Sequence, residues 1–155
     1  MKAVLQIVSS ATVYADGQFS GNINKGLHIL LGVEGEDSEL DAELLCEKIS
    51  KLRIFEDENG RMNLSVMDID GEVMVVSNFT LNANYEHGNR PDYLSGAAPA
   101  LANELYEYFV TLMSKKVKNV ATGKFGSDMK IDMTAIGPVT IVMESSKLKK
   151  GKNKS

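Results

Sequence analysis

The first 33 residues of the chain alternate between apolar runs and tight turns, a pattern typical of β-strands. Lys2–Ser10 and Ala11–Ala15 are rich in Val, Leu and Ile with partial alternation, and Asp16-Gly17 supplies the positive φ angles of a tight hairpin. The run Gly26–Val33 is almost entirely apolar, which predicts a strand buried on both faces. This part of the chain is therefore expected to be all β.

Two later segments have the spacing of amphipathic helices, with apolar residues at intervals of three and four. Ser38-x-x-Asp41 resembles a helix-opening capping box, and the first helix is expected to run to Leu52. Pro99 suits the first turn of the second helix, which is expected to end near Lys115-Lys116. The apolar positions are Leu40, Leu44, Leu45, Ile49 and Leu52 in the first helix, and Leu101, Leu105, Phe109, Leu112 and Met113 in the second.

Shorter apolar runs between and after the helices complete the pattern. Asn59-Gly60 marks a second hairpin, and the polar stretch Asn82–Ser95 is a loop long enough to suggest a function. The sequence predicts a single mixed α/β domain over residues 1–146, with largely antiparallel β-sheets in a layered or barrel-like arrangement covered by two helices. The remaining strands are predicted at residues 52–55, 62–66, 71–77, 117–121, 129–133 and 139–143.

The net charge of −4 conceals a basic tail on an acidic body. Residues 147–155, Lys-Leu-Lys-Lys-Gly-Lys-Asn-Lys-Ser, hold five of the 17 basic side chains and no acidic one, so we expect a disordered, solvated tail. The rest of the chain has 12 basic side chains against 21 acidic ones, which disfavours a protein that binds a long stretch of nucleic-acid phosphates. A weak electrostatic contact between the tail and a polyanion is the alternative.

Composition also indicates in which cellular compartment the protein is found. Cys46 is the single cysteine, which excludes an internal disulfide framework and fits a reducing environment. The first residues lack the layout of a signal peptide, and no apolar run approaches the roughly 18 residues of a membrane helix. We therefore expect a cytoplasmic protein without a membrane partner.

Most familiar catalytic and metal-binding motifs are missing from the sequence. There is no P-loop, no G-x-S-x-G nucleophile elbow and no G-x-G-x-x-G fingerprint. His28 lies in an apolar strand, which favours a core or interface role, while His87 lies in the polar loop and Cys46 in a helix. Their spacing does not suggest a zinc site, and we expect no metal ion and no cofactor.

Two stretches are not explained by the fold pattern. Ser77-Asn-Phe-Thr80 places polar residues directly after a buried strand, where backbone groups become free to bind a ligand and a hydroxyl could act as nucleophile. Gly137-Pro138 stands at the start of an apolar strand, where both residues are unfavourable. An X-Pro bond can be cis, and glycine lets another molecule approach the main chain. An ordinary turn at a strand end is the alternative for each stretch.

Taken together and in order, several segments resemble one family, the bacterial D-aminoacyl-tRNA deacylases, from Met1 to about Met143. So many similar segments in a single order are far more specific than any one motif. The Lys-rich tail lies outside the resemblance. The segments are Val8-Ser-Ser-Ala11, Lys51-Leu-Arg-Ile-Phe-Glu-Asp57, Met62-Asn-Leu-Ser65, Ser77-Asn-Phe-Thr-Leu81, Gly88-Asn-Arg-Pro91, Ser95-Gly-Ala-Ala-Pro99, Ala121-Thr-Gly-x-Phe-Gly126 and Gly137-Pro-Val-Thr140.

The resemblance implies a proofreading hydrolase that cleaves the ester between a D-amino acid and the terminal ribose of tRNA. It also implies a homodimer with active sites at the interface. Gly137 and Pro138 of one subunit, joined by a cis peptide bond, would reach into the pocket of the other and reject L-amino acids with main-chain atoms. The catalytic residues that the resemblance implies are Ser77, Asn78, Phe79 and Thr80.

Within that catalytic segment, main-chain N–H groups around Phe79 are expected to stabilise the oxyanion of the reacting ester. The neighbouring ribose hydroxyl of tRNA is expected to assist water, so no histidine base is required. Thr80 has the chemistry of a covalent nucleophile but no base beside it, so we expect it to position the substrate. Glycyl-tRNA is an expected second substrate, because glycine has no Cβ that could clash with the main chain.

Three positions depart from the family pattern. Asn78 stands where the family usually has Gln, Ile7 where it has Arg, and Ala135-Ile136 where it often has Asn-Asp. In the family, the arginine braces the residues that correspond to Gly137-Pro138. These departures motivate two alternatives: editing of glycyl- or small L-aminoacyl-tRNA with relaxed chirality, and a dimeric module that binds the tRNA acceptor end without catalysis.

Overall fold

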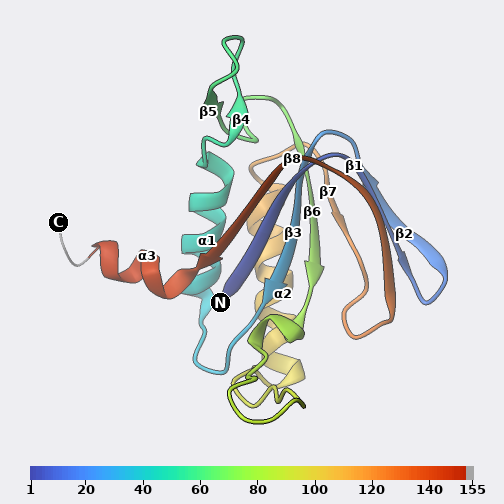
Figure 1. Ribbon diagram of the computed structural model, residues 1–155, viewed down its shortest axis with the longest axis vertical. Coiled ribbons are helices and arrows are strands. Elements are labelled where there is room, and N and C mark those ends of the chain that lie inside the picture. Colours follow the sequence, from blue (N-terminus) through green and yellow to red (C-terminus); the bar gives the residue numbers. More distant parts are fainter. Residues whose placement is uncertain (153–155) are drawn as a thin grey trace.

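One long strand, β1 (Lys2–Ala15), organises the sheet of the computed structural model, which describes residues 1–152. The first half of β1 pairs with β3 (Gly26–Gly32), and its second half pairs with β2 (Gln18–Ile23). Along its other edge β1 pairs with β8 (Met129–Glu144) over nearly its whole length (Figure 1). Much of the sheet therefore depends on backbone hydrogen bonds to a single strand.

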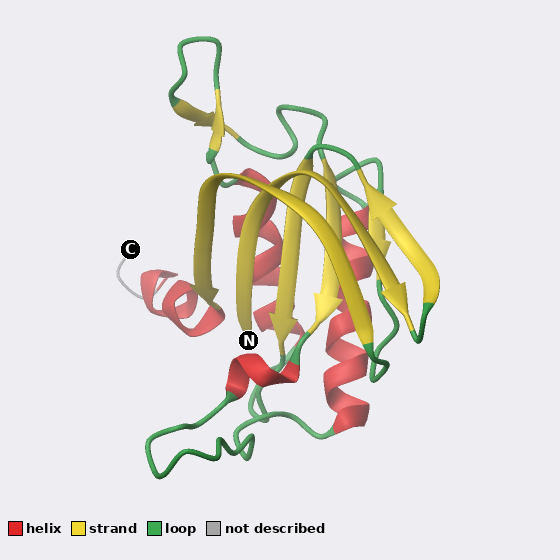
Figure 2. Ribbon diagram, turned by 45° about the vertical axis from the view of Figure 1, so that its right-hand side comes forward, coloured by secondary structure: helices red, strands yellow, loops and turns green. Residues whose placement is uncertain are grey.

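The sheet continues through two parallel strands and curls until its ends meet. β6 (Glu72–Ser77) pairs with β3, and β7 (Val120–Thr122) pairs with β6. The Oγ of Ser20 in β2 donates to the carbonyl of Thr122 at 2.7 Å, which links the two ends of the path through the six-stranded sheet. The predicted barrel-like arrangement is confirmed, and Figure 2 shows its strong curvature. The antiparallel pairs around β1 are extended by two parallel ones.

Two helices cover one face of the sheet, as the periodicity predicts (Figure 2). α1 (Glu39–Lys51) opens at the predicted capping box, where Asp41 accepts the backbone N–H of Ser38 at 2.9 Å. α2 (Pro99–Ser114) begins at its proline. Large apolar side chains from both helices and from the sheet form the main core, and burying each contributes about 1.5–3 kcal/mol. Members of this core include Leu5, Leu27, Ile29, Leu45, Ile49, Phe55, Val73, Leu105 and Phe109.

A small hairpin projects from the body between α1 and β6 (Figures 1 and 2). It consists of β4 (Phe55–Glu56) and β5 (Met62–Leu64), which pair antiparallel. The predicted Asn59-Gly60 signal lies at its turn, where Gly60 has a φ of +72°. The strands are shorter than the sequence predicts, but the hairpin itself is confirmed.

A third helix, α3 (Ser145–Lys152), lies where the sequence predicts a disordered tail from residue 147. The helix is held in part by Leu148, which packs against the main core. The two helices that cover the sheet are those predicted, and α3 is a third helix that the sequence does not predict, because composition counts these lysines as solvated charge and does not show their partners. Residues 153–155 of the predicted tail lie outside the described residues.

Asp41 at the start of α1 holds α3 in place. Its side chain accepts hydrogen bonds from Ser145 Oγ at 2.6 Å and from Lys149 Nζ at 2.9 Å. Burial alone raises the pKa of this carboxyl, but hydrogen bonds from Lys149 and Ser145 outweigh burial and lower the pKa to about 2. The α-amino group of Met1 also donates to Ser145, at 3.0 Å. The start of β1 and the helices α1 and α3 thus meet in one polar network.

β8 is one continuous strand, although the sequence predicts two strands separated at Gly137-Pro138. The register between β1 and β8 shifts at this point, because Gln6 pairs with Thr140 and Val8 pairs with Ala135. The extra residues of β8 form a bulge, which accommodates a Gly-Pro pair between two regular stretches of the ladder. β1 is likewise a single strand rather than the two predicted.

Neither a membrane-spanning helix nor a metal cluster occurs in the described part of the chain. None of the helices within residues 1–152 is both long and apolar enough to cross a bilayer. The same residues hold no group of three His, Cys, Asp or Glu side chains that could bind a metal ion. Cys46 is buried in the main core, and burial raises the pKa of its thiol to about 11, which fits the predicted packing role.

His28 is a buried polar side chain that forms no hydrogen bond within residues 1–152. It lies in β3 between Gln6 and Met74 of the neighbouring strands and is 2% exposed. Neither ring nitrogen meets a partner within the described residues. Burial favours the neutral ring and lowers its pKa from 6.5 to about 4. His28 is therefore a core residue, one of the two roles that the sequence allows.

His28→Leu is expected to remove part of the acid sensitivity of the fold. Between pH 6.5 and about 4 the unfolded chain binds a proton at residue 28 that the folded chain does not, so stability falls as the pH falls through this window. The difference in free energy of unfolding, variant minus wild type, is expected to be about 3 kcal/mol larger at pH 4 than at pH 7. Urea unfolding at several pH values measures this difference, with His87→Leu in the exposed loop as control. A difference that is the same at every pH contradicts the prediction.

Candidate functional site

A pocket of about 810 Å³ opens at the carboxyl end of β6, and its size is typical of small-molecule sites. One wall consists of the end of β6 and the 3₁₀ helix η1 (Phe79–Asn82). α2 and the loop that leads into β8 contribute further lining residues. The four predicted catalytic residues all line this pocket: Ser77, Asn78, Phe79 and Thr80.

The end of the sheet positions this motif. The parallel ladder between β3 and β6 ends where Ser77 pairs with Leu31, and the N–H of Asn78 then donates to the Leu31 carbonyl at 2.8 Å. The chain turns into η1 because Asn78 Oδ1 accepts the backbone N–H of Thr80 at 3.1 Å and caps the helix. Ser77 and Asn78 are half-buried, whereas Phe79 and Thr80 are exposed. The motif therefore passes from the core to the pocket surface within one turn.

The side chains of Asn78 and Thr80 are joined with a defined polarity. A backbone N–H can only donate, so the Asn78 atom that faces the N–H of Thr80 is the amide oxygen. The Thr80 hydroxyl contacts the same oxygen. Because an amide oxygen can only accept, the hydroxyl donates its proton to Asn78. Thr80 Oγ1 therefore offers acceptor lone pairs to a ligand, and Asn78 cannot act as the base that a nucleophile would need.

Within the described residues, the backbone N–H of Phe79 is an unengaged main-chain donor of the motif. The N–H groups on either side of it are bonded, whereas that of Phe79 donates to no group within residues 1–152. An unpaired N–H is usual at the start of a helix and is available to an oxyanion in the pocket. The ring of Phe79 is 64% exposed and packs edge-on against Tyr93, with 5.0 Å between the ring centroids.

No described side chain of the pocket is placed to act as a base for Thr80. Tyr106 donates its hydroxyl to the Val75 carbonyl at 2.8 Å, and burial together with nearby Glu107 raises its pKa to about 12, so the phenol stays neutral. Asp128 lines the pocket but forms no hydrogen bond with Thr80. The described lining contains no His, Cys or Lys. The available chemistry is that of backbone dipoles, hydroxyl oxygens, water and the carboxylate of Asp128, which is not bonded to Thr80.

The sequence does not single out three aromatic residues that line the pocket. Tyr93 belongs to the polar loop whose length suggests a function, and Phe125 belongs to a segment that resembles the family. The loop length and the resemblance each indicate the correct region, but neither identifies a particular residue. Tyr106 lies on the buried face of α2, where its spacing is that of an ordinary core residue. Only the tertiary structure identifies it as part of the pocket.

Gly137 and Pro138 lie outside this pocket in their own chain. They are joined by a cis peptide bond, as the resemblance implies, in the bulge of β8 opposite Ile7. Ile7 lies four residues along β1 from Ala3, which is at the level of Ser77. The bulge is thus about 13 Å along the strands and about 14 Å across them from the Ser77–Thr80 motif. Within one chain the structure does not bring the Gly-Pro pair to the motif.

The bulge is exposed and requires glycine. Gly137 has a φ of +115°, and a Cβ there would lie 2.6 Å from the backbone nitrogen of Val139. Residues 132–138 are all exposed and include the apolar side chains of Met133 and Ile136. Ile7, by contrast, is buried in the main core, so it can pack beside the bulge but cannot donate hydrogen bonds as the family arginine can.

Residues 4–144 match the family described as D-Tyr-tRNA(Tyr) deacylase. A D-aminoacyl-tRNA deacylase of Clostridioides difficile (strain 630) is 50% identical over 147 residues, which cover 95% of this chain and 99% of the relative. A D-aminoacyl-tRNA deacylase of Thermosipho melanesiensis is 48% identical over 149 residues, which cover 96% and 99%. The similarity therefore extends over nearly the full length of both relatives.

Solved structures show the same fold. The structure titled c-Myc DNA Unwinding Element Binding Protein superposes with a TM-score of 0.87 at 37% identity and covers 93% of this chain and 98% of its own. A probable eukaryotic D-amino acid tRNA deacylase superposes with a TM-score of 0.78 at 13% identity, over 92% and 98%. From the sequence match and this architecture together, the chain belongs to the D-Tyr-tRNA(Tyr) deacylase family.

Proposed function

We propose that the protein hydrolyses the ester bond of D-aminoacyl-tRNA and releases the free D-amino acid and tRNA. Family membership supports this activity. The observation that carries it is the unengaged N–H of Phe79 beside a hydroxyl acceptor, in a pocket whose described lining has no histidine, cysteine or lysine. Such a site stabilises an oxyanion and orients the substrate, which suits an ester that already carries its own neighbouring hydroxyl. The enzyme needs no cofactor for this step and acts in the cytoplasm, where aminoacyl-tRNA is used.

The reaction takes place at one carbonyl group. Water forms a bond to the carbonyl carbon, the bond from that carbon to the ribose oxygen breaks, and the ribose oxygen takes up the proton that water loses. The N–H of Phe79 faces the negative charge that develops on the carbonyl oxygen, and a donor of this kind contributes about 10²–10³ in rate. The neighbouring hydroxyl of the same ribose assists the attacking water, so the protein supplies no base.

Thr80 binds the substrate in this proposal, and Asn78 positions Thr80. Because the Thr80 proton is donated to Asn78, its oxygen accepts a hydrogen bond from a donor of the substrate. The same geometry disfavours covalent attack by Thr80, since the amide oxygen of Asn78 cannot accept the proton fully. The shorter side chain of Asn78, compared with the usual Gln, reaches the Thr80 hydroxyl and its N–H at once.

We also infer a homodimer in which each pocket is completed by the partner subunit. Gly137 and Pro138 lie on an exposed bulge, away from the pocket of their own chain. Met133 and Ile136 beside them are 38% and 46% exposed, which leaves apolar surface for a second copy to cover. The acceptor end of tRNA would then bind between a pocket of one subunit and the bulge of the other.

The proposed rejection of L-amino acids is geometric. D- and L-amino acids differ in the direction that Cβ takes from Cα, so a rigid carbonyl that holds the α-ammonium group can block one direction and leave the other open. Gly137 and Pro138 supply main-chain atoms for this purpose, and Gly137 cannot be exchanged without strain. Because this rejection does not depend on which side chain the substrate has, one pocket accepts many D-amino acids. Glycine, which has no Cβ, is accepted as well.

The wild-type enzyme is expected to release the amino acid from D-Tyr-tRNA and Gly-tRNA but not from L-Tyr-tRNA. Loss of labelled amino acid from the tRNA measures each rate. Faster release from Gly-tRNA or L-Ala-tRNA than from D-Tyr-tRNA would support the alternative that Ile7 and Asn78 motivate, an editing enzyme with relaxed chirality. Saturable binding with unchanged ester lifetimes would contradict the enzymatic proposal and support a binding module.

Substitutions at Thr80 and Asn78 test the assigned polarity. Thr80→Val is expected to lower kcat/KM by about 10–100-fold because it removes the acceptor oxygen, whereas Thr80→Ser, which keeps the oxygen, stays within a few-fold of wild type. Asn78→Ala is expected to reduce kcat/KM in the wild-type background and to have a smaller effect in the Thr80→Val background, because part of its effect acts through Thr80 and the rest through the cap of η1. Full additivity of the two substitutions would contradict this coupling. An acyl group found on Thr80 by mass spectrometry would show covalent catalysis instead.

A mixture of two weakened variants tests the shared site. Gly137→Ala distorts the bulge, and Thr80→Val impairs the pocket. If the bulge serves the partner subunit, mixed dimers contain one intact site, and random mixing restores about a quarter of wild-type activity on D-Tyr-tRNA. If the bulge acted within its own chain, mixed dimers would contain no intact site and activity would not recover. Each variant mixed with itself is the control.

A further inference from the structure

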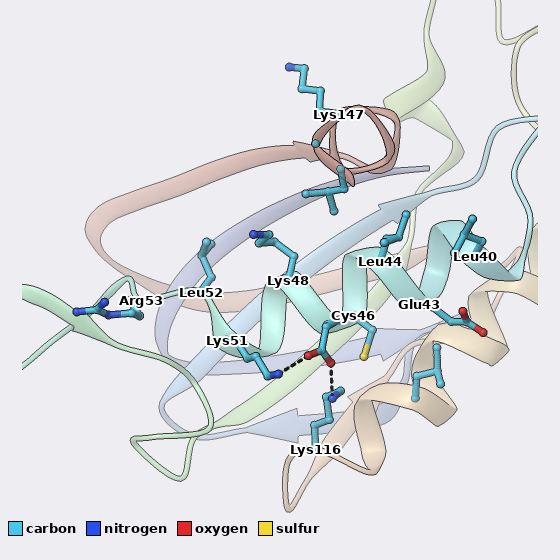
Figure 3. A pocket seen from close by; sticks show the side chains of 14 residues that line it. Leu40, Glu43, Leu44, Cys46, Lys48, Lys51, Leu52, Arg53, Lys116 and Lys147 are labelled. Carbon is cyan, nitrogen blue, oxygen red and sulfur yellow. Dashed lines mark hydrogen bonds and ion pairs between the residues drawn. The ribbon is translucent and has the colours of Figure 1, made fainter. Parts of the chain in front are cut away.

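A second hollow lies along the outer face of α1, away from the catalytic pocket (Figure 3). It has a volume of about 1050 Å³ and is bounded by the end of α2 and by α3. Leucines from the three helices and the turn after α1, including Leu44, Leu112 and Leu148, give it an apolar base. We call this hollow the α1 groove.

Positive charge is concentrated in the α1 groove. Five basic and two acidic side chains line it, whereas the whole chain has 17 basic and 21 acidic ones. Lysines in the last turn of α1 also stabilise that helix through its dipole. The dipole does not explain why the end of α2 and α3 contribute lysines to the same hollow. The basic residues are Lys48, Lys51, Arg53, Lys116 and Lys147.

Much of this charge remains available to a ligand. Lys51 and Lys116 share one carboxylate, that of Glu47, and exposed ion pairs of this kind are weak. Lys48 makes no ion pair or hydrogen bond within residues 1–152, and Figure 3 shows it on the opposite side of α1 from Lys116. Lys147 lies 3.7 Å from a carboxylate oxygen of its neighbour Glu144, a loose surface contact. The groove can therefore bind an anion without breaking a buried interaction.

We propose that the α1 groove binds backbone phosphates of the tRNA acceptor arm, beyond the terminal nucleotide in the catalytic pocket. This inference rests on the proposed function. α2 connects the two sites, because Ala102 lines the catalytic pocket and Leu112 lines the groove, about 15 Å away along the helix. Lysines on flexible stems above an apolar surface suit phosphates and read no base sequence. An enzyme that serves many tRNAs needs contacts of this kind.

Charge reversal at two positions of the groove tests the proposal. The Lys48→Glu/Lys147→Glu variant is compared with Lys25→Glu/Lys118→Glu, an equal change of charge at exposed residues outside both pockets. The groove variant is expected to bind uncharged tRNA about tenfold or more weakly, with a salt slope reduced by about two. Its KM for D-Tyr-tRNA is expected to rise by a similar factor at unchanged kcat. Hydrolysis of D-tyrosyl-adenosine, which has no phosphate, is expected to stay at the wild-type rate.

Unchanged binding of uncharged tRNA by the groove variant, or an equal loss in the control variant, would overturn the proposal. Displacement of tRNA by poly-glutamate at the same charge concentration would also overturn the proposal, because that result indicates an acidic protein as the partner. If the reversed variant does not fold, Lys48→Gln/Lys147→Gln provides the same comparison, because it removes the same two phosphate contacts and lowers the salt slope by about two, with a smaller loss of affinity. Binding of uncharged tRNA involves no turnover, so failure of the proposed function shows separately, as absence of D-tyrosyl-adenosine hydrolysis by the wild type.

Discussion

The pairing of β1 with three other strands is the constraint on which the rest of the structure depends. Through β3 it fixes β6 and therefore the place where Ser77 leaves the sheet and the predicted catalytic motif, Ser77–Thr80, begins. Through β8 it fixes the bulge that holds Gly137 and Pro138 at the level of Ile7. Because both segments are tied to the same ladder, they cannot approach each other within one chain. A shared site in a dimer follows directly from this geometry if both segments act on one substrate.

The chemistry assigned to the pocket relies on the main chain more than on reactive side chains. The unengaged N–H of Phe79 results from ending a strand and starting a 3₁₀ helix at the same point, and Asn78 makes that turn possible by capping the helix. The same amide oxygen orients the Thr80 hydroxyl. One side chain thus determines both the backbone geometry and the polarity of the pocket. A substrate that contributes its own hydroxyl compensates for the lack of a base.

The sequence predicts those parts of the molecule that depend on local pattern. Helical spacing gives α1 and α2, and the Asp-Gly and Asn-Gly turns give both hairpins. The resemblance, rather than any pattern of spacing, selects Ser77 to Thr80 from among several polar strand ends. Local pattern fails where long-range contacts decide. α3 is stabilised by an ion pair between Lys149 and Asp41, which are more than 100 residues apart in the sequence. Tyr106 lines the pocket because α2 packs beside β6, where the Tyr106 hydroxyl donates to the Val75 carbonyl. The α1 groove combines three helices, so no segment of sequence shows it.

The central claim is that a pocket of one subunit and the Gly-Pro bulge of its partner act on the same aminoacyl group. A crystal structure with a non-hydrolysable amide analogue of D-tyrosyl-adenosine tests it most directly. The interpretation predicts the analogue's carbonyl oxygen at the N–H of Phe79 and its α-ammonium group against the main-chain carbonyls at Gly137 and Pro138 of the second subunit. An analogue held by a single chain, with both copies of the bulge remote from it, would contradict the interpretation.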